Sequence, residues 1–428
     1  MSAAPSHILW DAPAAAHVLR RVGFGADRER VEHAVREGLE ATLVDVESRR
    51  EHSKLLTSSS IEHLASLGKL APLQARWMAL ILGDGAPLLE RTTLMWHGHF
   101  ATSNAKVNDV QLMHRQNELF RRKGLGDFRE LFLAVAKDPA MLIWLDGDLN
   151  RAGAPNENFA REVLELFGLG IQGGYTEDDI KDTARALSGW TVARRRFVFR
   201  REHHDGGEKT LFGRGGVFTG EQAIARVLEH PECKRWIARR LLTTFVLPDP
   251  TREHVERWGD VLAEEDWHIG RTLARLFRDP LFLSVEARRS RISSPVELIA
   301  GVALATRAEV APAEAARAAA AMGQSLFEPP TVKGWDGGRA WIDPGTWLSR
   351  HNLLTRFALE GKLDVARTFG DVSRDDAVDA VCDLFLPDGV ERDMRAALDD
   401  ASRSAPSESD ALRHVTALVL TSPEYQLS

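Results

Sequence analysis

Apolar residues recur every three or four positions along most of the chain. The spacing is clearest in five segments, at residues 12–25, 27–48, 70–82, 127–145 and 220–246. Because an α-helix returns to the same face every 3.6 residues, this spacing predicts helices that each bury one side. The alternating pattern of strands is scarce. We therefore expect a mainly α protein, a helical domain with long irregular loops.

One region favours β-structure. The segments "RRRFVFRR" (194–201) and "KTLFGRGGVFTG" (209–220) are short and rich in Phe, Val and Gly, and they flank the glycine-containing "EHHDGGE" (202–208). Two such runs around a glycine-containing connection are typical of a hairpin. We expect these two segments to form one small β-hairpin or flap.

Helix ends are marked clearly in two places. Asn156 suits the start of a helix that ends at Gly168 or Gly170. In the next helix, Thr176 is followed three residues later by Asp179, which approximates a capping box. The acidic first turn of that second helix is therefore explained by structure.

Two irregular stretches divide the chain, at residues 146–158 and 327–347, and both are rich in Gly, Pro and Asn or Asp. Connections this long commonly carry binding or active-site residues, although they also serve as cover for a core. A chain of 428 residues allows two or three domains, or one large one. We expect a single helical domain, 1–428, with 1–150 and 151–428 as candidate subdomains.

Composition and charge narrow the classes of partner. The net charge is -7 and the pI about 6.1, which argues against nucleic acid. Two basic runs, 193–202 and 286–291, fit solvated faces, and a local anion site is the alternative. Two distant cysteines give no disulfide framework. With no long apolar run and no signal pattern, we expect no membrane span and a cytoplasmic protein.

A first set of candidate catalytic residues lies on the helix that follows Asn156. Glu157, Arg161, Glu162 and Glu165 fall on one polar arc, opposite the apolar positions. The simplest interpretation is a solvated face with ion pairs four residues apart. If the face turns into a cleft instead, Arg161 would keep its neighbours ionised while Glu162 acts as base or ligand. Loss of Arg161 would then cost about 3–5 kcal/mol, against almost nothing on a solvated face.

The segment "MWHGHFATSN" raises a second candidate. His97 and His99 point roughly 200° apart on a helix but share a side on extended chain, so both can bind one metal only if Gly98 ends the helix. The alternative is core packing, with Trp96 and Phe100 as neighbours.

A third cluster follows the predicted β-segment. His204 and Asp205 precede two glycines, which suits metal ligation, a base oriented by a carboxylate, or a tight turn. The candidate metal ligands are therefore His97, His99 and His204, and Asp205 joins the four helix residues as a catalytic candidate. Histidine and carboxylate together suit zinc, iron or manganese.

Common motifs for cofactor binding and for catalysis are absent from the sequence. It has no phosphate-binding P-loop, no dinucleotide fingerprint, no HExxH and no nucleophile elbow. Trp335, Trp341 and Trp347 lie in the second irregular stretch, where they pack against the loop or form a platform on which a carbohydrate stacks.

Several stretches together carry a family resemblance, among them "LRRVGFG", "MWHGHFATSNAKV", "PNENFAREVLELFGLGIQGGYTEDDIKDTARALSGW", "HHDGGEKTLFG" and "GQSLFEPPTVKGWDGGRAWIDPGTWLSR". In consistent order from about Leu19 to Arg350, they resemble the bacterial family catalogued as domain of unknown function 1800. The resemblance implies no reaction. It implies that His97, His99, the Asn156 to Glu165 face, His204 with Asp205, and the Lys333 to Trp335 loop are motif positions. The chain departs from the family pattern at Gly98, where members often have asparagine.

The resemblance also implies a partner, a sulfatase-like protein of the family domain of unknown function 1501. Export together with that partner is the alternative to a cytoplasmic location. From the residues we expect a metal-dependent or acid/base enzyme, with hydrolysis as the reaction that needs no organic cofactor. The alternative is a non-catalytic helical scaffold or escort for the sulfatase-like partner.

Overall fold

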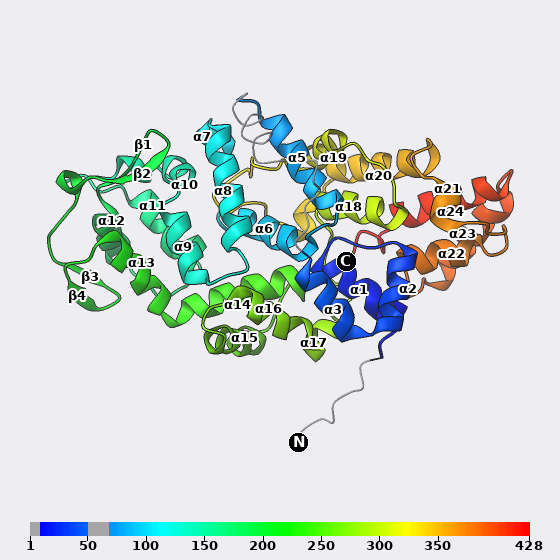
Figure 1. The fold of residues 1–428 in the computed structure, drawn as a ribbon, viewed down its shortest axis with the longest axis horizontal. Helices are drawn as coiled ribbons and strands as arrows, with labels where there is room; N and C mark the ends of the chain where they lie inside the picture. Colours follow the sequence, from blue (N-terminus) through cyan, green and yellow to red (C-terminus); the bar gives the residue numbers. More distant parts are fainter. Residues whose placement is uncertain (1–8, 50–67) are drawn as a thin grey trace, which may run out of the picture.

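Figure 1 shows a computed structural model of the chain, which describes residues 9–49 and 68–428. Nearly all regular structure in these residues is helical, and the two sheets have two strands each. The expectation of a mainly α fold is confirmed. Along the described ranges, no helix combines the length and the apolar character needed to cross a bilayer.

Before position 150, each predicted helical segment contains one or two helices. Breaks occur where the backbone requires them, at Gly38, which has φ +86°, and ahead of Pro139, which begins a helix capped by Asp138. The elements are α1 (Ala12–Val22), α2 (Arg28–Glu37), α3 (Leu39–Ser48), α5 (Leu70–Leu82), α6 (Pro87–His99), α7 (Asn104–Val107), α8 (Val110–Lys123), α9 (Phe128–Ala136), α10 (Pro139–Trp144) and η1 (Gly147–Leu149).

The middle of the chain begins with a helix whose second half is a π-helix. Asn156 caps its start by accepting from the N–H of Asn158, and Thr176 and Asp179 form the expected capping box. The elements are α11 (Glu157–Glu162), the π-helix η2 (Val163–Gly168), α12 (Glu177–Leu187), β1 (Trp190–Ala193), β2 (Arg196–Phe199), η3 (Arg201–His203), β3 (Lys209–Leu211), β4 (Arg214–Gly216), α13 (Gly220–Glu229), α14 (Pro231–Phe245), α15 (Arg252–Glu264), α16 (Ile269–Phe277) and α17 (Pro280–Leu283).

The remainder is again helical apart from the irregular stretch before α20. Its elements are α18 (Pro295–Thr306), α19 (Pro312–Ala321), η4 (Gly338–Trp341), α20 (Pro344–Leu359), α21 (Val365–Phe369), α22 (Ala377–Phe385), α23 (Arg392–Ser404) and α24 (Glu408–Thr421). In Figure 1 the strands and α9 to α13 lie at one end of an elongated molecule, α20 to α24 lie at the other, and α6 lies near the middle.

The β-region differs from the prediction of one hairpin built from two segments. β1 pairs with β2, and β3 pairs with β4, so there are two local hairpins. Each turns through two residues with positive φ, Arg194 with Arg195 and Phe212 with Gly213. Such turns match the natural twist of antiparallel strands, and they close each hairpin on itself.

Two large clusters of buried apolar side chains form most of the core of the described residues, and a third, small one contains Ala186, Leu211 and Ala223. The first surrounds the end of α6, where Trp96 and Phe100 stack with Phe128 at ring distances of 5.6 and 6.4 Å. The second joins α5 and α18 to the C-terminal helices. Both clusters draw residues from either side of position 150. The end of α6 therefore lies inside the first core cluster.

Candidate functional site

His97 lies within α6, because this helix continues through Gly98 and ends at His99. Its Nε2 accepts a hydrogen bond from the backbone N–H of Phe327 at 3.1 Å. The ring packs edge-on against Trp77 and Trp335, at centroid distances of 5.3 and 5.4 Å. Burial lowers the pKa of His97 to about 3, so the ring is neutral near pH 7.

His99 has different neighbours. Its Nε2 donates to the carbonyl of Phe167 at 3.0 Å, and its ring contacts Trp96 and Phe100. Phe167 lies in the π-helix η2, and Trp236 donates its indole N–H to the carbonyl of the preceding residue at 2.8 Å. Burial lowers the pKa of His99 to about 3. The two ring N–H donors thus hold the π-turn in place.

The expected set of metal ligands does not come together. Since Gly98 does not end the helix, His97 and His99 face different partners, and each uses its Nε2 in a hydrogen bond. Within residues 9–49 and 68–428, no group of three or more His, Cys, Asp or Glu side chains is placed to hold a metal ion. The metal therefore stays a prediction from the sequence.

Most of the polar arc on α11 faces solvent. Arg161 pairs with Glu177 at 2.7 Å, with Glu165 at 3.4 Å and with Glu157 at 3.7 Å. The side chain of Arg161 is 33% exposed and that of Glu177 is 66% exposed. These contacts match the interpretation of the arc as a solvated face with ion pairs. Glu177, at the start of α12, adds one partner that the sequence did not predict.

Glu162 differs from the rest of the arc. It is only 9% exposed, and its Oε2 has no hydrogen-bond partner in the part of the chain that the structure describes. Burial raises the pKa of this carboxyl and Glu165 raises it further, while Arg161 and Lys333 act in the opposite direction. Of the four candidates on α11 and η2, Glu162 is the one whose environment suits acid/base chemistry.

His204 and Asp205 secure a local turn. The Nδ1 of His204 donates to the carbonyl of Ser188 at 3.0 Å. The Arg185 guanidinium donates to both oxygens of Asp205, at 2.8 and 3.2 Å, and the N–H of Gly207 donates at 2.8 Å. The hydrogen bonds from Arg185 lower the pKa of Asp205 to about 2. Of the alternatives raised by the sequence, these contacts match the tight turn.

Two of the motif segments lie in contact, the end of α6 at Gly98 and the loop at Gly334. Gly334 has φ +84°, and a Cβ placed on it would lie 2.4 Å from the carbonyl oxygen of Gly98. The loop that carries Trp335 therefore rests directly on the last turn of α6, with His97 bonded to Phe327 at the start of the same loop.

Beside this contact lies a cavity of about 710 Å³, which we call the arginine cleft. Its walls come from α6, α14, the segment before α18, and the loop that contains η4. The lining residues are Arg91, Leu94, Met95, Gly98, Arg240, Thr243, Thr244, Pro248, Asp249, Ser290, Arg291, Ile292, Ser294, Glu297, Gln324, Trp335, Asp336, Gly337, Gly338, Arg339 and Trp341.

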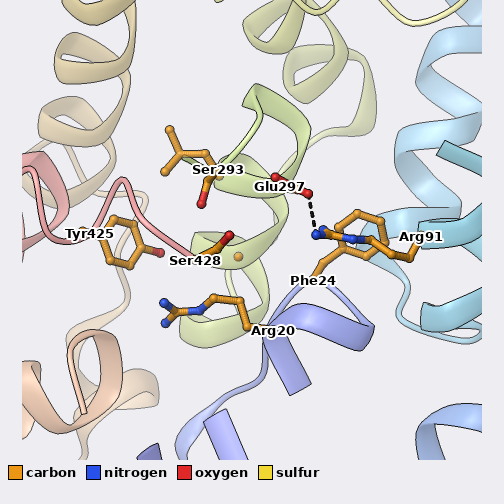
Figure 2. A pocket seen from close by; sticks show the side chains of 9 residues that line it. Arg20, Phe24, Arg91, Ser293, Glu297, Tyr425 and Ser428 are labelled. Atoms are coloured by element: carbon orange, nitrogen blue, oxygen red, sulfur yellow. Dashed lines mark ion pairs between the residues drawn. The ribbon is translucent and has the colours of Figure 1, made fainter. Parts of the chain in front are cut away.

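One carboxylate of the cleft is shared between two guanidinium groups. Glu297 lies 2.5 Å from Arg91 and 3.8 Å from Arg291, and Figure 2 shows it pointing from α18 toward Arg91. Burial acts to raise the pKa of Glu297, but the two arginines outweigh it and lower the pKa to about 2. Arg91 and Glu297 also line a second cavity of about 20 Å³, which is large enough for one water molecule.

Arg240 has no carboxylate partner among the described residues. Its Nη2 donates to the carbonyl of Met95 at 3.1 Å, and its Nε has no hydrogen-bond partner there. Burial lowers the pKa of Arg240 to about 10, and the positive charge of Arg291 adds to this effect. The Nη1 of Arg291 and the indole N–H of Trp335 likewise have no hydrogen-bond partner in the described ranges.

Two more buried arginines lie close to these groups. Arg21 donates to the carbonyls of Val246, Ala287 and Ser428, and Arg350 donates to Gln426 and to the carbonyl of Ser293. Neither has an ion pair within the described part of the chain, and the charges of Arg291 and Arg91 help to lower the pKa of Arg21. Positive charge thus exceeds negative charge in this interior.

The comparisons with known proteins place the chain in a family. The family described as "Protein of unknown function (DUF1800)" matches residues 17–427, and the chain belongs to it. No curated protein and no solved structure matched the chain. The resemblance expected from the motif segments is confirmed.

Proposed function

We propose that this protein binds an anionic organic ligand in the arginine cleft. The observation that carries the proposal is that Arg240, which has no carboxylate partner among the described residues, lines one cavity with Arg291 and Trp335, and each of the three has a buried N–H without a hydrogen-bond partner there. A buried donor without an acceptor costs about 1–3 kcal/mol, and more when it is charged. An anion in the cleft would supply acceptors and neutralise the excess positive charge.

Arginine suits this role because its planar group offers several N–H donors to one oxyanion. Arg91 is already committed to Glu297, whereas Arg240 contacts only a backbone carbonyl. We therefore assign the main anion contact to Arg240, with Arg291 as its neighbour.

The first experiment measures binding of inorganic sulfate and phosphate, by tryptophan fluorescence and calorimetry at constant ionic strength. We expect saturable binding that falls by about tenfold or more in Arg240→Gln, because a hydrogen bond to a charged group contributes about 1.5–3 kcal/mol. The matched control is Arg239→Gln. Arg239 immediately precedes Arg240 on α14, is exposed, and lines a different cavity. Equal binding in the two variants would refute the proposal.

A second variant keeps every charge in the cleft. A Cβ at Gly98 would lie 2.9 Å from Nη2 of Arg240, and alanine favours the helical conformation of this position. We expect Gly98→Ala to keep the fold and to weaken sulfate binding by crowding Arg240. Undiminished binding in this variant would place the anion elsewhere.

Acid/base catalysis is the second candidate function, and the unpartnered Oε2 of Glu162 favours it. In this proposal Glu162 acts as general base in a hydrolytic reaction, and the metal expected from the sequence would activate the water. The test is a screen against esters of phosphate, sulfate and carboxylic acids, with metal analysis of the purified protein. Activity that survives in Glu162→Gln would remove this candidate. A scaffold for a sulfatase-like partner is the remaining alternative.

A further inference from the structure

The arginine cleft is much larger than a simple anion requires. Its volume of about 710 Å³ falls in the range of about 300–1,000 Å³ that is typical of pockets for organic ligands. A water molecule takes about 30 Å³ of liquid volume. The anionic group therefore accounts for a small part of the ligand, and the other walls determine the rest.

Two tryptophans form one of these walls. Trp341 is 7% exposed and Trp335 is partly exposed, and both line the cleft. The ring of Trp335 is held by the edge of His97, which is itself fixed by the N–H of Phe327. Aromatic faces held in this way offer an apolar surface to the C–H face of a ring.

Other residues that line the cleft are polar and offer hydrogen-bond acceptors. They are Thr243, Thr244, Asp249 and Asp336. Both threonine hydroxyls donate to the carbonyl of Arg240, at 3.2 and 2.8 Å, so each oxygen can still accept a hydrogen bond, and both residues line the cleft. Asp249 and Asp336 are exposed and carry carboxylate acceptors. These groups suit a ligand with several O–H donors.

The charges limit how anionic the ligand is. Four arginines (Arg91, Arg240, Arg291 and Arg339) and three acids (Asp249, Glu297 and Asp336) line the cleft, which gives a net charge of +1. The three carboxylates would repel a polyphosphate. A ligand with a single anionic group can instead pair with Arg240 and Arg291. A ring with one acidic group and several hydroxyls matches the arginines, the tryptophans and the hydrogen-bond acceptors of the cleft.

On these grounds, and resting on the proposed function above, we propose that the arginine cleft binds an acidic carbohydrate, a sugar that carries a sulfate, phosphate or carboxylate group. Arg240 and Arg291 bind the acidic group, Trp341 packs against the sugar ring, and Asp336 accepts hydrogen bonds from hydroxyls. The three acidic groups share one recognition chemistry, which the experiment separates.

The experiment compares binding of glucose 6-sulfate, glucose 6-phosphate, glucuronic acid, glucose, inorganic sulfate and AMP, by calorimetry on the full chain. We expect at least one acidic sugar to bind about tenfold or more tighter than both glucose and inorganic sulfate, since ring stacking and hydroxyl contacts add to the anion contact. Which acidic sugar binds best identifies the acidic group.

Asp336→Asn gives the sharpest test, because it changes two ligands in opposite directions. The acidic sugar loses a charged acceptor and should bind about fivefold or more weaker, while inorganic sulfate loses a repulsive charge and should bind as well or better. Asp371→Asn is the control, since Asp371 is exposed and lies outside the cleft. Trp341→Leu, checked for folding by circular dichroism, should lower only the sugar affinity.

The outcomes separate the two proposals. If sulfate binds through Arg240 but no acidic sugar binds more tightly than sulfate, the carbohydrate assignment is wrong and the anion site is still supported. If AMP binds as tightly as the best sugar, and Asp336→Asn leaves both unchanged, the ligand is a nucleotide and the assignment is wrong. If none of the anions binds, both proposals fail.

Discussion

Removal of the Glu297 charge tests most directly whether this carboxylate stabilises the buried Arg91 and Arg291. Glu297→Gln keeps the shape of the side chain, and the backbone N–H of residue 297 still donates to the Ser294 hydroxyl that caps α18. The carboxylate side chain also accepts from the N–H of Ser294 at 2.6 Å. Without its charge, Arg91 and Arg291 face each other in a poorly solvated region. We expect a large loss of stability near pH 7.

The magnitude follows from the pKa of Glu297, which is about 2 in the folded chain against the ordinary value of 4.5. At about 1.36 kcal/mol for each pKa unit, the ionised form contributes roughly 3 kcal/mol to folding. Because the folded pKa is depressed, this contribution is complete well above pH 4.5 and is lost as the pH falls toward 2. At pH 3.5 more than a third of it should already be gone, roughly 1 kcal/mol.

The assay is urea unfolding of the wild type and Glu297→Gln, followed by tryptophan fluorescence at pH 7 and pH 3.5. Comparing the two chains at each pH removes the titration of all other groups. Glu314→Gln is the control, since Glu314 is half exposed and pairs with Lys362 at 3.3 Å. An exposed pair contributes at most about 1 kcal/mol. If Glu297→Gln costs no more than the control, or if its cost stays constant on acidification, the reasoning is wrong.

Three further substitutions have defined expectations under the same assay. Arg161→Ala should cost at most about 1 kcal/mol, because its ion pairs face solvent, and a loss of about 3 kcal/mol would mean that the α11 face is buried. His99→Phe should cost about 1–3 kcal/mol, since the carbonyl of Phe167 loses its donor, and an unchanged stability would show that water replaces the ring. Gly334→Ala should cost about 2 kcal/mol or more, and clearly more than Gly361→Ala, which has a similar positive φ but open space around it. Equal losses at the two glycines would deny the close contact with α6.

Local features of the fold were predictable from the sequence because local physics produces them. The helix spacing, the cap at Asn156 and the capping box of Thr176 and Asp179 each depend on residues within one or two turns, and the structure confirms them. The hairpins were predicted in the right region but with the wrong partners. Turn residues such as Arg194 and Arg195, which adopt positive φ without being glycine, gave no sequence signal for two separate hairpins.

The cleft could not be predicted, because its groups are brought together by long-range packing. Arg91, Arg240 and Arg291 lie on α6, on α14 and before α18. Of the two basic runs for which the sequence left an anion site open, only the run at residues 286–291 reaches the cleft, through Ser290 and Arg291. Glu162 was a candidate from the sequence, but its burial, which separates it from its exposed neighbours, depends on tertiary packing.

The "HGH" segment holds other parts of the structure in position. His97 fixes the loop that carries Trp335, His99 fixes the π-helix, and Gly98 lies on the cleft against Arg240. Neutral rings that each use Nε2 in a hydrogen bond suit positioning, since a charged ring would be costly in this core. Continuation of the helix through Gly98 is what directs the two rings to opposite neighbours while leaving the position between them open to the cleft. The segment therefore positions two groups that line the arginine cleft, Trp335 through His97 and Arg240 through Gly98.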